Sequence, residues 1–423
     1  MYSIRHLHLN PSKRIPLLRD QNGPDDAPES LQVSKTYTAP SSALQKSSQS
    51  SSMKPEDASV YFISNATTII EWQGLRILTD PNFLHVGDHV HLGPGVTAQR
   101  LKNPAVDLHE LPSIDLVLLS HYHEDHFDRF VEDKLNRDFD IVTTPHAKGC
   151  LTSEARYAGG GNWSLGHGSE KKEEERREDS GGPFRAVHDL DTFESIMLHI
   201  DDPKHGKPLM GGYGMVPVMK ITAMPGKHVP PGALGVVNDL LRAVPPTNGW
   251  LLEMGWSVST PSTPSATTGS GGHVTKTDSQ SIDTGYRIYI SGDTLFVDEL
   301  REIPKYIREQ KLVQLPYSSP PSHRRDGPGT EIDLMIVHLG GTTIPGPMMP
   351  LLMVTMDARQ GTELMRLLNP DLTIPVHFDD YSVMLSPLSD FKTEVEKMGE
   401  GWRDRVVYLE RGEQFRFRVR GSM

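Results

Sequence analysis

The stretch that decides the fold is Ser120-His121-Tyr122-His123-Glu124-Asp125-His126-Phe127-Asp128. It directly follows residues 114–119, a short run rich in Leu, Val and Ile that is typical of a buried strand. The histidines therefore lie in a loop at the carboxyl end of that strand. Neutral imidazoles suit zinc, iron or manganese, and a neighbouring carboxylate adds negative charge to such a site. The stretch predicts a metal-binding loop, and a solvated histidine-rich loop is the alternative.

The composition of the 423 residues restricts the classes of function and location. A formal net charge of −12 at pH 7 disfavours a nucleic-acid partner, because phosphate backbones are bound by basic surfaces. The single cysteine, Cys150, excludes an intrachain disulfide and fits a reducing compartment. No apolar run approaches the roughly 18 residues that span a bilayer. We therefore expect a cytoplasmic protein without an integral membrane segment, and the basic, acid-free residues 1–19 make a mitochondrial presequence the alternative.

Changes in composition divide the chain into a tail and one large domain. Residues 1–56 are predicted to form a disordered N-terminal tail, because most of them are polar and bury too little apolar surface to offset the ordering entropy. Residues 57–423 are predicted to form a single domain. Within it, a charged segment at about 157–183 and a Ser-, Thr- and Gly-rich segment at about 257–283 predict flexible insertions.

Short runs of β-branched and aromatic residues predict many strands, and one stretch with helical spacing predicts a helix. The predicted strands are 60–63, 67–72, 75–78, 140–144, 184–187, 194–200, 218–224, 250–254, 286–291, 332–337 and 372–376, with a closing pair at 405–409 and 414–418. The predicted helices are 130–135 and 356–368.

Acidic and histidine side chains follow six separate strand-like runs, which is hard to explain by core packing alone. These residues are Asp80, the group His121 to His126, His228, Asp293, His338 and His377. Because strand ends on one rim of a sheet converge, we expect a binuclear metal site. In it, one metal is held by His121, His123 and His228, the other by Asp125, His126 and His377, and Asp293 bridges both.

The order of these ligands resembles the metallo-β-lactamase superfamily, whose motifs match Asp80, then His121-x-His123-x-Asp125-His126, then His228, Asp293 and His377. The resemblance extends from about Ser59 to the end of the chain. It implies an α+β fold, a four-layer αββα sandwich, with the metals in a cleft along one edge.

Four shorter motifs resemble one branch of that superfamily, which contains ascorbate-phosphate lactonases and N-acyl-phosphatidylethanolamine phospholipase D. They are Thr79-Asp80-Pro81, Pro225-Gly226-Lys227-His228, Ser291-Gly292-Asp293-Thr294 and Pro375-Val376-His377. His338 departs from this branch, which more often has an apolar or small residue there, and so do the two insertions. The di-iron oxidoreductases of the fold resemble His-x-Glu-x-Asp, whereas this chain has His123 in place of the glutamate, which disfavours redox chemistry.

The ligand set predicts hydrolysis by a metal-bound hydroxide. Two metals about 3.5 to 4 Å apart bring the pKa of a shared water toward about 7, so that hydroxide attacks a carbonyl or phosphoryl centre. Asp80 is expected to orient a histidine ligand. His338, Tyr381 and Asp125 are the candidates for protonating the leaving group.

We expect two zinc ions, with manganese or iron as alternatives. The expected reaction is hydrolysis of a phosphodiester in a small-molecule or lipid-like substrate. A lactonase or other carboxyl-ester hydrolase is the alternative, and a non-catalytic metal-binding scaffold is an alternative of another class. The apolar residues 345–356 are a candidate lipid-facing patch, and a buried wall or the contact of a homo-oligomer is the competing interpretation.

Overall fold

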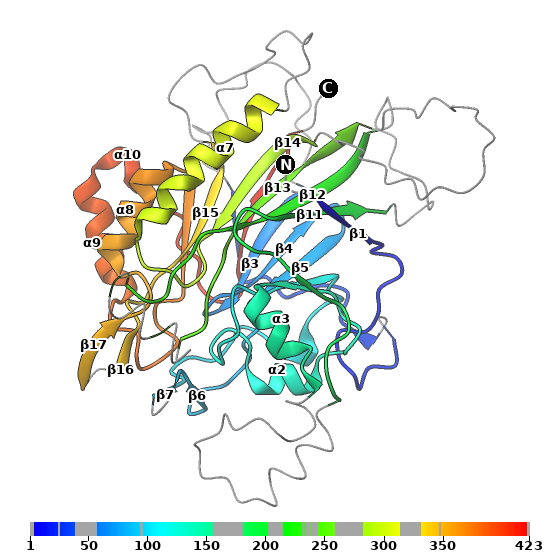
Figure 1. The fold of residues 1–423 in the computed structure, drawn as a ribbon, viewed down its shortest axis with the longest axis horizontal. Coiled ribbons are helices and arrows are strands. Elements are labelled where there is room, and N and C mark those ends of the chain that lie inside the picture. The colour runs from blue at the N-terminus through cyan, green and yellow to red at the C-terminus, as the bar shows by residue number, and fades with distance from the viewer. Residues whose placement is uncertain are drawn as a thin grey trace, which may run out of the picture.

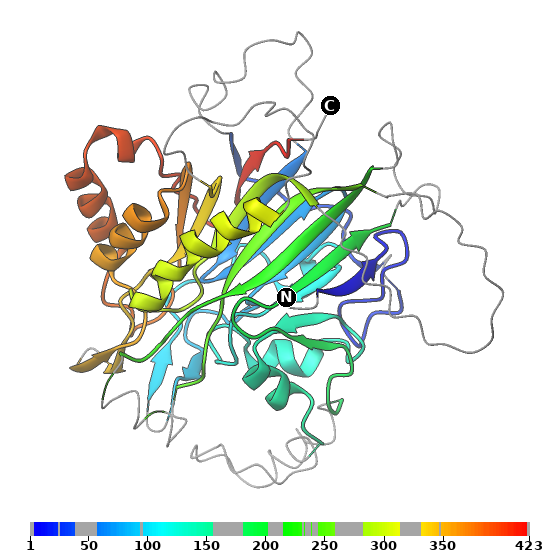
Figure 2. The ribbon, with the colours of Figure 1, turned by 45° about the horizontal axis from the view of Figure 1, so that its top comes forward.

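The computed structural model describes residues 4–23, 26–38, 57–93, 96–154, 181–201, 215–230, 232, 238, 244–258, 282–313, 331–346 and 348–420. Two large β-sheets pack face to face at its centre, with helices on both outer sides (Figure 1). Turning the molecule by 45° shows the same layers from another side (Figure 2).

A seven-stranded sheet and an eight-stranded sheet make the two inner layers. The first contains, in spatial order, β1 (Arg5–Leu9), β11 (Ser195–Ile200), β12 (Met215–Met224), β13 (Gly249–Val258), β14 (Ile282–Ile290), β15 (Leu334–His338) and β18 (Leu372–Val376). The second contains β10 (Val187–Asp189), β9 (Ile141–Thr143), β8 (Leu116–Leu118), β5 (Leu75–Thr79), β4 (Thr67–Trp72), β3 (Ala58–Ser64), β19 (Glu413–Phe417) and β2 (Lys35–Thr38). Two separate hairpins are β6 (His89–His91) with β7 (Thr97–Gln99), and β16 (Thr343–Gly346) with β17 (Met349–Met353).

Apolar side chains cover both faces of the sheets, because successive residues of a strand point to opposite faces. In β13, Trp250 and Leu252 face the apolar core between the sheets, whereas Leu251 faces the helices. Successive side chains of a strand point to opposite faces, so a strand that is buried on both sides is apolar throughout. This explains why the strands of the central layers appear in the sequence as continuous apolar runs.

Helices cover the outer face of each sheet. The seven-stranded sheet packs on residues of α7 (Glu302–Val313), α8 (Ala358–Leu368) and α9 (Leu388–Met398), which is followed by α10 (Glu400–Arg403). The eight-stranded sheet packs on α2 (Arg129–Lys134) and α3 (Pro145–Leu151). The short 3-10 helices η3 (Leu108–Glu110) and η4 (Asp298–Arg301) lie in connections. The layers therefore run helix, sheet, sheet, helix, and the predicted αββα sandwich is confirmed.

Helix α8 shows how the sequence sets these boundaries. It begins after Asp357, whose Oδ1 accepts a hydrogen bond from the Gln360 backbone N–H at 2.8 Å, a typical N-cap. It ends at Asn369 in the left-handed conformation with φ 47°, where a short polar side chain is tolerated. Its buried face includes Leu364 and Met365, which pack in the outer core against the sheet.

Residues 4–23 and 26–38 are ordered, so the predicted disordered tail is wrong for these residues. β1 pairs in parallel with β11, and β2 pairs in parallel with β19. Leu18 is buried in the outer core, and Arg14 forms a 2.8 Å ion pair with the buried Asp115. Edge strands are held by backbone hydrogen bonds and need only a few apolar side chains. The polar composition of this segment therefore did not indicate that it contains strands.

The predicted strand at 405–409 is also wrong, although β19 corresponds to its expected partner. Val406 makes only an isolated bridge to Thr373 of β18, and the Thr373 N–H donates to the Arg405 carbonyl at 2.7 Å. β19 pairs with β3 and β2 in the opposite sheet instead. The two segments therefore belong to different layers.

Several expectations concern residues outside the described part of the chain. These are the remainder of the predicted tail, 1–3, 24–25 and 39–56, and most of the two predicted insertions, at 155–180 and 259–281. Among the described residues, no helix has both the length and the apolar character needed to cross a membrane.

Candidate metal centre

The strand ends bring the predicted ligands to one edge of the sandwich. The group His121 to His126 follows β8, His228 follows β12, Asp293 follows β14 and His377 follows β18. These strands come from both sheets, so the site lies where the rims of the two sheets meet. The structure brings these side chains together there.

One cluster consists of His121, His123 and His228, whose potential ligand atoms lie within 4.8 Å of one another. The Nε2 atoms of His121 and His228 are 3.0 Å apart. His228 Nδ1 lies 2.9 Å from the Val354 carbonyl, which can only accept, so the proton sits on Nδ1 and the lone pair on Nε2. His121 Nδ1 lies 2.9 Å from the Ser120 hydroxyl. Both rings therefore aim Nε2 at the same point.

A second cluster consists of Asp125, His126, Asp293 and His377, again within 4.8 Å. Asp293 Oδ2 is 3.2 Å from His126 Nε2 and 3.5 Å from His377 Nε2. Asp125 Oδ2 is 3.4 Å from His377 Nε2. All four side chains are buried, so charges and lone pairs face one another out of contact with bulk water.

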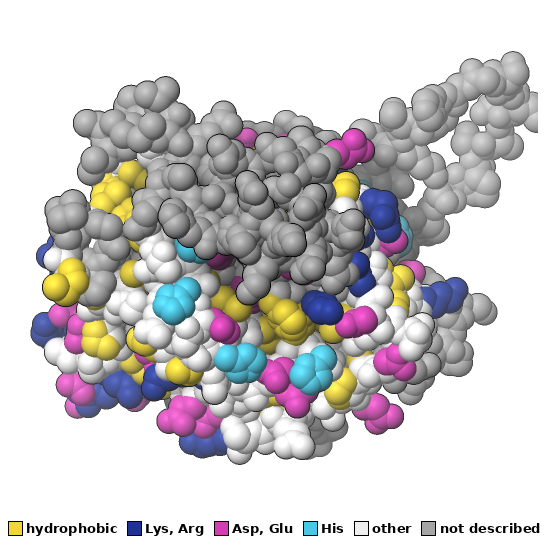
Figure 3. All heavy atoms as spheres, turned by 90° about the horizontal axis from the view of Figure 1, so that it is seen from below, with side chains coloured by type: hydrophobic (Ala, Val, Ile, Leu, Met, Phe, Trp, Pro, Cys, Tyr) yellow, Lys and Arg dark blue, Asp and Glu magenta, His cyan; other side chains and the backbone are white. Residues whose placement is uncertain are grey.

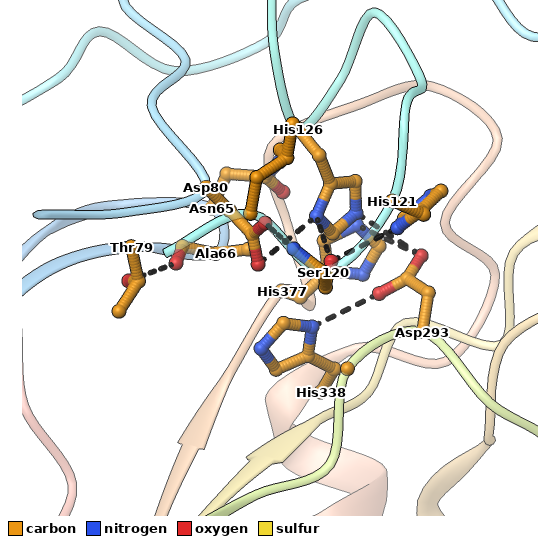
Figure 4. A network of polar contacts seen from close by, with 12 residues as sticks. Asn65, Ala66, Thr79, Asp80, Ser120, His121, His126, Asp293, His338 and His377 are labelled. Carbon is orange, nitrogen blue, oxygen red and sulfur yellow. Dashed lines mark hydrogen bonds and ion pairs between the residues drawn. The ribbon is translucent and has the colours of Figure 1, made fainter. Parts of the chain in front are cut away.

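Residues behind the clusters fix the orientation of these rings (Figure 4). Asp80 Oδ2 lies 3.4 Å from His126 Nδ1, and Asp80 Oδ1 accepts the Ser120 backbone N–H at 2.7 Å. His377 Nδ1 donates to the Leu339 carbonyl at 2.9 Å. Asp80 and His377 have left-handed φ values of 36° and 60°, a costly conformation for residues with side chains. Asp80 thus lies beside His126, one of the candidate ligands.

Burial and mutual charge set the protonation of the clusters. Burial, together with His126, lowers the pKa of His121 well below its usual value. Burial also lowers the pKa of His228, to about 4. Burial alone would raise the pKa of Asp125, but His126 and His377 lower it to about 2. At neutral pH the first cluster therefore offers neutral imidazoles and the second offers ionised carboxylates, the forms of these groups that bind metals. Burial lowers the pKa of His126, but Asp293 and Asp125 raise it well above its usual value, so a metal ion would displace a proton from this ring.

The residues fit a pair of divalent cations. Asp125 Oδ1 is buried and has no hydrogen-bond partner among the described residues, and His126 Nε2 has carboxylate neighbours, with Asp293 Oδ2 at 3.2 Å. Buried polar atoms are normally satisfied, so such atoms require a ligand, water or ion. Imidazole nitrogens with carboxylate oxygens are a donor set that zinc, manganese and iron all accept. A third group, Asp80, His126 and His338, also lies within 4.8 Å, but it shares His126 with the second cluster.

The clusters open into a pocket whose empty space, including the part open to solvent, is about 270 Å³. Four ligand candidates line it, together with apolar side chains and two threonines: His123, Asp125, His228, Asp293, Leu92, Val244, Ile344, Val354, Thr342 and Thr355. None of these lining residues is Lys or Arg. On the face seen from below, histidine and acidic side chains lie beside hydrophobic ones (Figure 3).

His338 and Tyr381 do not line this pocket, contrary to their candidacy as leaving-group acids. His338 Nδ1 lies 3.0 Å from Asp293 Oδ1, so its ring contacts the carboxylate from behind. The Tyr381 hydroxyl donates to Asn82 Oδ1 at 2.9 Å, and burial raises its pKa far above the usual value. Both side chains contact neighbouring residues, Asp293 and Asn82 respectively, and lie outside the pocket lining.

The sequence did not single out three residues that support the site. Thr355 Oγ1 donates to Asp293 Oδ2 at 2.9 Å. Asn65 Nδ2 donates to the Asp125 carbonyl at 2.6 Å, and Asn82 Nδ2 donates to the Glu124 carbonyl at 2.9 Å. Asn65 and Asn82 follow strand ends just as the ligands do, and this position was the available signal.

Comparisons with known proteins agree with this architecture. Residues 59–182 match the family model described as the beta-lactamase superfamily domain. Uncharacterized proteins of Mycobacterium tuberculosis and Mycobacterium bovis are 39% identical over 69 residues, 16% of this chain. That match spans only 18% of the length of these curated relatives.

Solved structures with low sequence identity are also similar. An isothiocyanate hydrolase from Delia radicum gut bacteria has a TM-score of 0.49 and 14% identity, over 85% of this chain and 99% of its own. A metallo hydrolase from Ignicoccus hospitalis has a TM-score of 0.40 and 15% identity, over 86% and 99%. CmlA, a diiron β-hydroxylase from Streptomyces venezuelae, has a TM-score of 0.40 and 13% identity, over 87% and 55%. Residues 59–182 therefore match a beta-lactamase superfamily domain, and the sheets and helices have the four-layer arrangement of the metallo-β-lactamase fold.

Proposed function

We propose that this protein is a metal-dependent hydrolase that cleaves a phosphodiester bearing an apolar group. The observation that carries the proposal is the pocket, in which candidate ligands of both clusters form one wall and Leu92, Val244, Ile344 and Val354 form others. A non-catalytic scaffold would need no such pocket, and it would not need a pocket-lining atom without a hydrogen-bond partner among the described residues, such as Asp125 Oδ1.

In this proposal His121, His123 and His228 hold one cation, Asp125, His126 and His377 hold the other, and Asp293 lies between the two. When bound, a pair of divalent cations supplies Lewis-acid polarisation and makes water acidic enough to act as a nucleophile near neutral pH. Zinc fits the donor set, and manganese or iron accept the same donors.

The charge of the pocket favours a singly charged reacting centre. Two divalent cations against the Asp125 and Asp293 carboxylates leave a surplus of positive charge, which suits a phosphodiester monoanion. The lining contains no Lys or Arg side chain, so a second phosphate or carboxylate on the substrate would find no partner there. The apolar walls stabilise an apolar substituent by about 25 cal/mol per Å² of area removed from water.

Thr342 provides a hydroxyl for the substrate. It lines the pocket, and its Oγ1 is buried without a hydrogen-bond partner among the described residues. A donor that is unsatisfied before binding gains a full hydrogen bond when a substrate oxygen enters. We assign Thr342 to binding a phosphoryl or carbonyl oxygen next to the scissile bond.

A carboxyl ester or lactone is the second candidate, and the absence of cationic side chains from the lining favours it, because a neutral substrate requires none. Initial rates on bis(p-nitrophenyl) phosphate, p-nitrophenyl esters of increasing acyl length and a lactone panel separate the two. The metal content of the same samples is measured by elemental analysis.

The proposal predicts turnover of the phosphodiester, loss of that turnover in Asp293→Ala, and retention in His109→Ala, an exposed histidine away from the site. Turnover of esters or lactones with no phosphodiesterase activity transfers the assignment to the second candidate. Rates that survive both chelation and Asp293→Ala reject metal-dependent hydrolysis altogether.

A further inference from the structure

Three histidines outside the metal centre gather on one edge of the seven-stranded sheet. His6 and His8 lie on β1, and His199 lies on the neighbouring β11, directly opposite His8 in the parallel register. Leu9 of the same strand is part of the core between the sheets, and side chains alternate along a strand. The three imidazoles therefore share the outer face. β1 lies at the sheet edge, away from helices α7 to α10 (Figures 1 and 2).

The three rings are nearly parallel, with His199 in the middle. The His6 and His199 ring centroids are 5.1 Å apart with an interplanar angle of 26°, and those of His8 and His199 are 4.5 Å apart with an angle of 12°. His6 Nδ1 lies 2.8 Å from His199 Nε2. Two nitrogens at this distance share one proton, so one of them presents a lone pair to the other.

The surroundings favour a cation over a protonated histidine cluster. Burial, then His8 and His6, lower the pKa of His199 to about 4, so its imidazole is neutral at physiological pH. Asp201 Oδ1 lies 3.9 Å from His8 Nδ1 and adds a carboxylate. A positive charge also lies nearby. Lys220 is two residues after Val218, the β12 partner of His199, and lies on the same face of the sheet, where it forms a 3.2 Å ion pair with Glu253. Its charge is thus compensated.

We propose that His6, His8 and His199, with Asp201, form a second, surface-exposed site for a transition-metal ion such as zinc, nickel or copper. The ion takes the place of the proton between His6 Nδ1 and His199 Nε2, and that proton moves to the other nitrogen of its own ring. No net proton is released. Imidazole suits these metals, and tetrahedral zinc has Zn–N distances of about 2.0 to 2.1 Å, so the two nitrogens need to separate only slightly.

His8 completes the site by a side-chain rotation. Its side chain is 67% exposed and that of Asp201 is 47% exposed, so both are free to turn toward the ion. The site is separate from the metal centre, because His199 pairs with Val218 of β12, six residues before the strand ends at Met224. At about 3.4 Å per residue this is about 20 Å along the strand.

An ion at this position joins β1 to β11. β1 is an edge strand, so local opening of the sheet starts with it. A ligand that binds only the closed state stabilises that state in proportion to its concentration over its dissociation constant. We expect exchange of the β1 amide hydrogens to slow about 100-fold at a free metal concentration of about 100 times the dissociation constant.

The test uses the full chain with its metal centre loaded and excess metal removed. Zinc chloride is titrated by calorimetry into wild type, His6→Ala/His8→Ala, His199→Gln and the control His109→Ala. Copper(II) replaces zinc for electron paramagnetic resonance, in which bound imidazole nitrogens split the signal. Hydrogen exchange of residues 5–9 is followed with and without zinc.

We expect one further equivalent of zinc in wild type and in His109→Ala, loss of that equivalent in both cluster variants, and nitrogen splitting only where it binds. Hydrolytic activity stays unchanged in the cluster variants, so failure of the metal centre and failure of this site are distinguished. The proposal is overturned if wild type binds no further equivalent, or if the cluster variants bind it with unchanged affinity.

Discussion

His121 Nε2 and His228 Nε2 lie 3.0 Å apart although the two residues are 107 positions apart in the chain. The outer nitrogen of each ring is already engaged, by Ser120 and by the Val354 carbonyl. His228 Nε2 presents a lone pair to His121 Nε2, and either a proton on His121 Nε2 or a cation held by both nitrogens can satisfy it. The fold therefore holds these rings in an arrangement that can accept a shared cation.

Removal of the metals should destabilise the protein. Each ion that binds only the folded state adds about 4 kcal/mol at a thousandfold excess over its dissociation constant. We expect a chelator to lower the melting temperature by several degrees, and two equivalents of zinc to restore it. Differential scanning calorimetry with metal analysis measures both. An unchanged melting temperature after complete metal removal would contradict this expectation.

His338 should position Asp293 without contacting the substrate. Its Nδ1 lies 3.0 Å from Asp293 Oδ1, and replacing such supporting partners typically costs about 10- to 100-fold in metal affinity or activity. We expect His338→Leu to weaken metal binding by that factor, measured by competition with a chromogenic chelator. His338→Gln should recover part of the affinity, because its amide donates a hydrogen bond. Wild-type metal affinity in His338→Leu would exclude the role.

The sequence predicted the layers better than it predicted the contacts around the candidate ligands. Continuous apolar runs followed by His or Asp identify both the strand and the place where it ends, as before His228 and Asp293. The contacts of His338 and Tyr381 could not be predicted from the sequence. The direction in which each side chain points depends on the path that the loop takes after the strand ends. That direction is set by contacts such as the hydrogen bond from Tyr381 to Asn82, 299 residues away.

Order in the N-terminal segment was missed for a related reason. The polar residues around Arg14 show no periodicity, but Arg14 donates to the buried Asp115 carboxylate at 2.8 and 2.9 Å. An ordering contact made by one ion pair across 101 positions leaves no trace in local composition. β1 is similarly held by pairing with β11, which sequence patterns do not specify.

Tyr381→Phe should retain activity. The hydroxyl donates to Asn82 Oδ1, which also accepts from Arg100 Nη1 at 3.0 Å, so Asn82 keeps a partner in the variant. We expect a loss of about 1 kcal/mol in unfolding free energy and a kcat within about twofold of wild type. The dependence of kcat on pH should not change. A lost limb in the pH–rate profile would instead make Tyr381 the leaving-group acid.

Thr342 should show opposite effects on activity and stability. Thr342→Val removes a buried hydroxyl that has no described partner, so the folded state becomes as stable or more stable by about 1 kcal/mol. The same variant loses a hydrogen bond to the substrate, and kcat/KM should fall about tenfold or more, since about 1.4 kcal/mol corresponds to a factor of ten. Thr342→Ser serves as the control and should keep most of the activity. Equal kcat/KM in Thr342→Val and wild type would remove Thr342 from the binding site.

Glu253 should contribute strongly to stability, because it is the centre of a buried ion-pair cluster away from the metal centre. It accepts from Arg287 at 2.9 Å and pairs with Lys220 at 3.2 Å, and the side chains of Glu253 and Lys220 are only 2% and 3% exposed. Removing one partner of a buried pair typically costs about 3 to 5 kcal/mol. We expect this loss in Glu253→Gln by urea denaturation. Asp298→Ala, which removes an exposed ion pair with Arg301, should show no measurable change.

The same cluster predicts the pH range over which this stability is present. Burial raises the pKa of Glu253, but Lys220 and Arg287 lower it further, so the net pKa lies below the ordinary 4.5. Its contribution is therefore complete above that value and is lost as the pH falls through the lowered pKa. Burial lowers the pKa of Lys220, but Glu253 raises it above 10.5, so this contribution is complete below 10.5 and is lost at higher pH. The difference in unfolding free energy between wild type and Glu253→Gln should thus be constant between pH 4.5 and 10.5 and become smaller outside this range. A difference that grows toward acid pH would show that Glu253 is protonated in the folded protein.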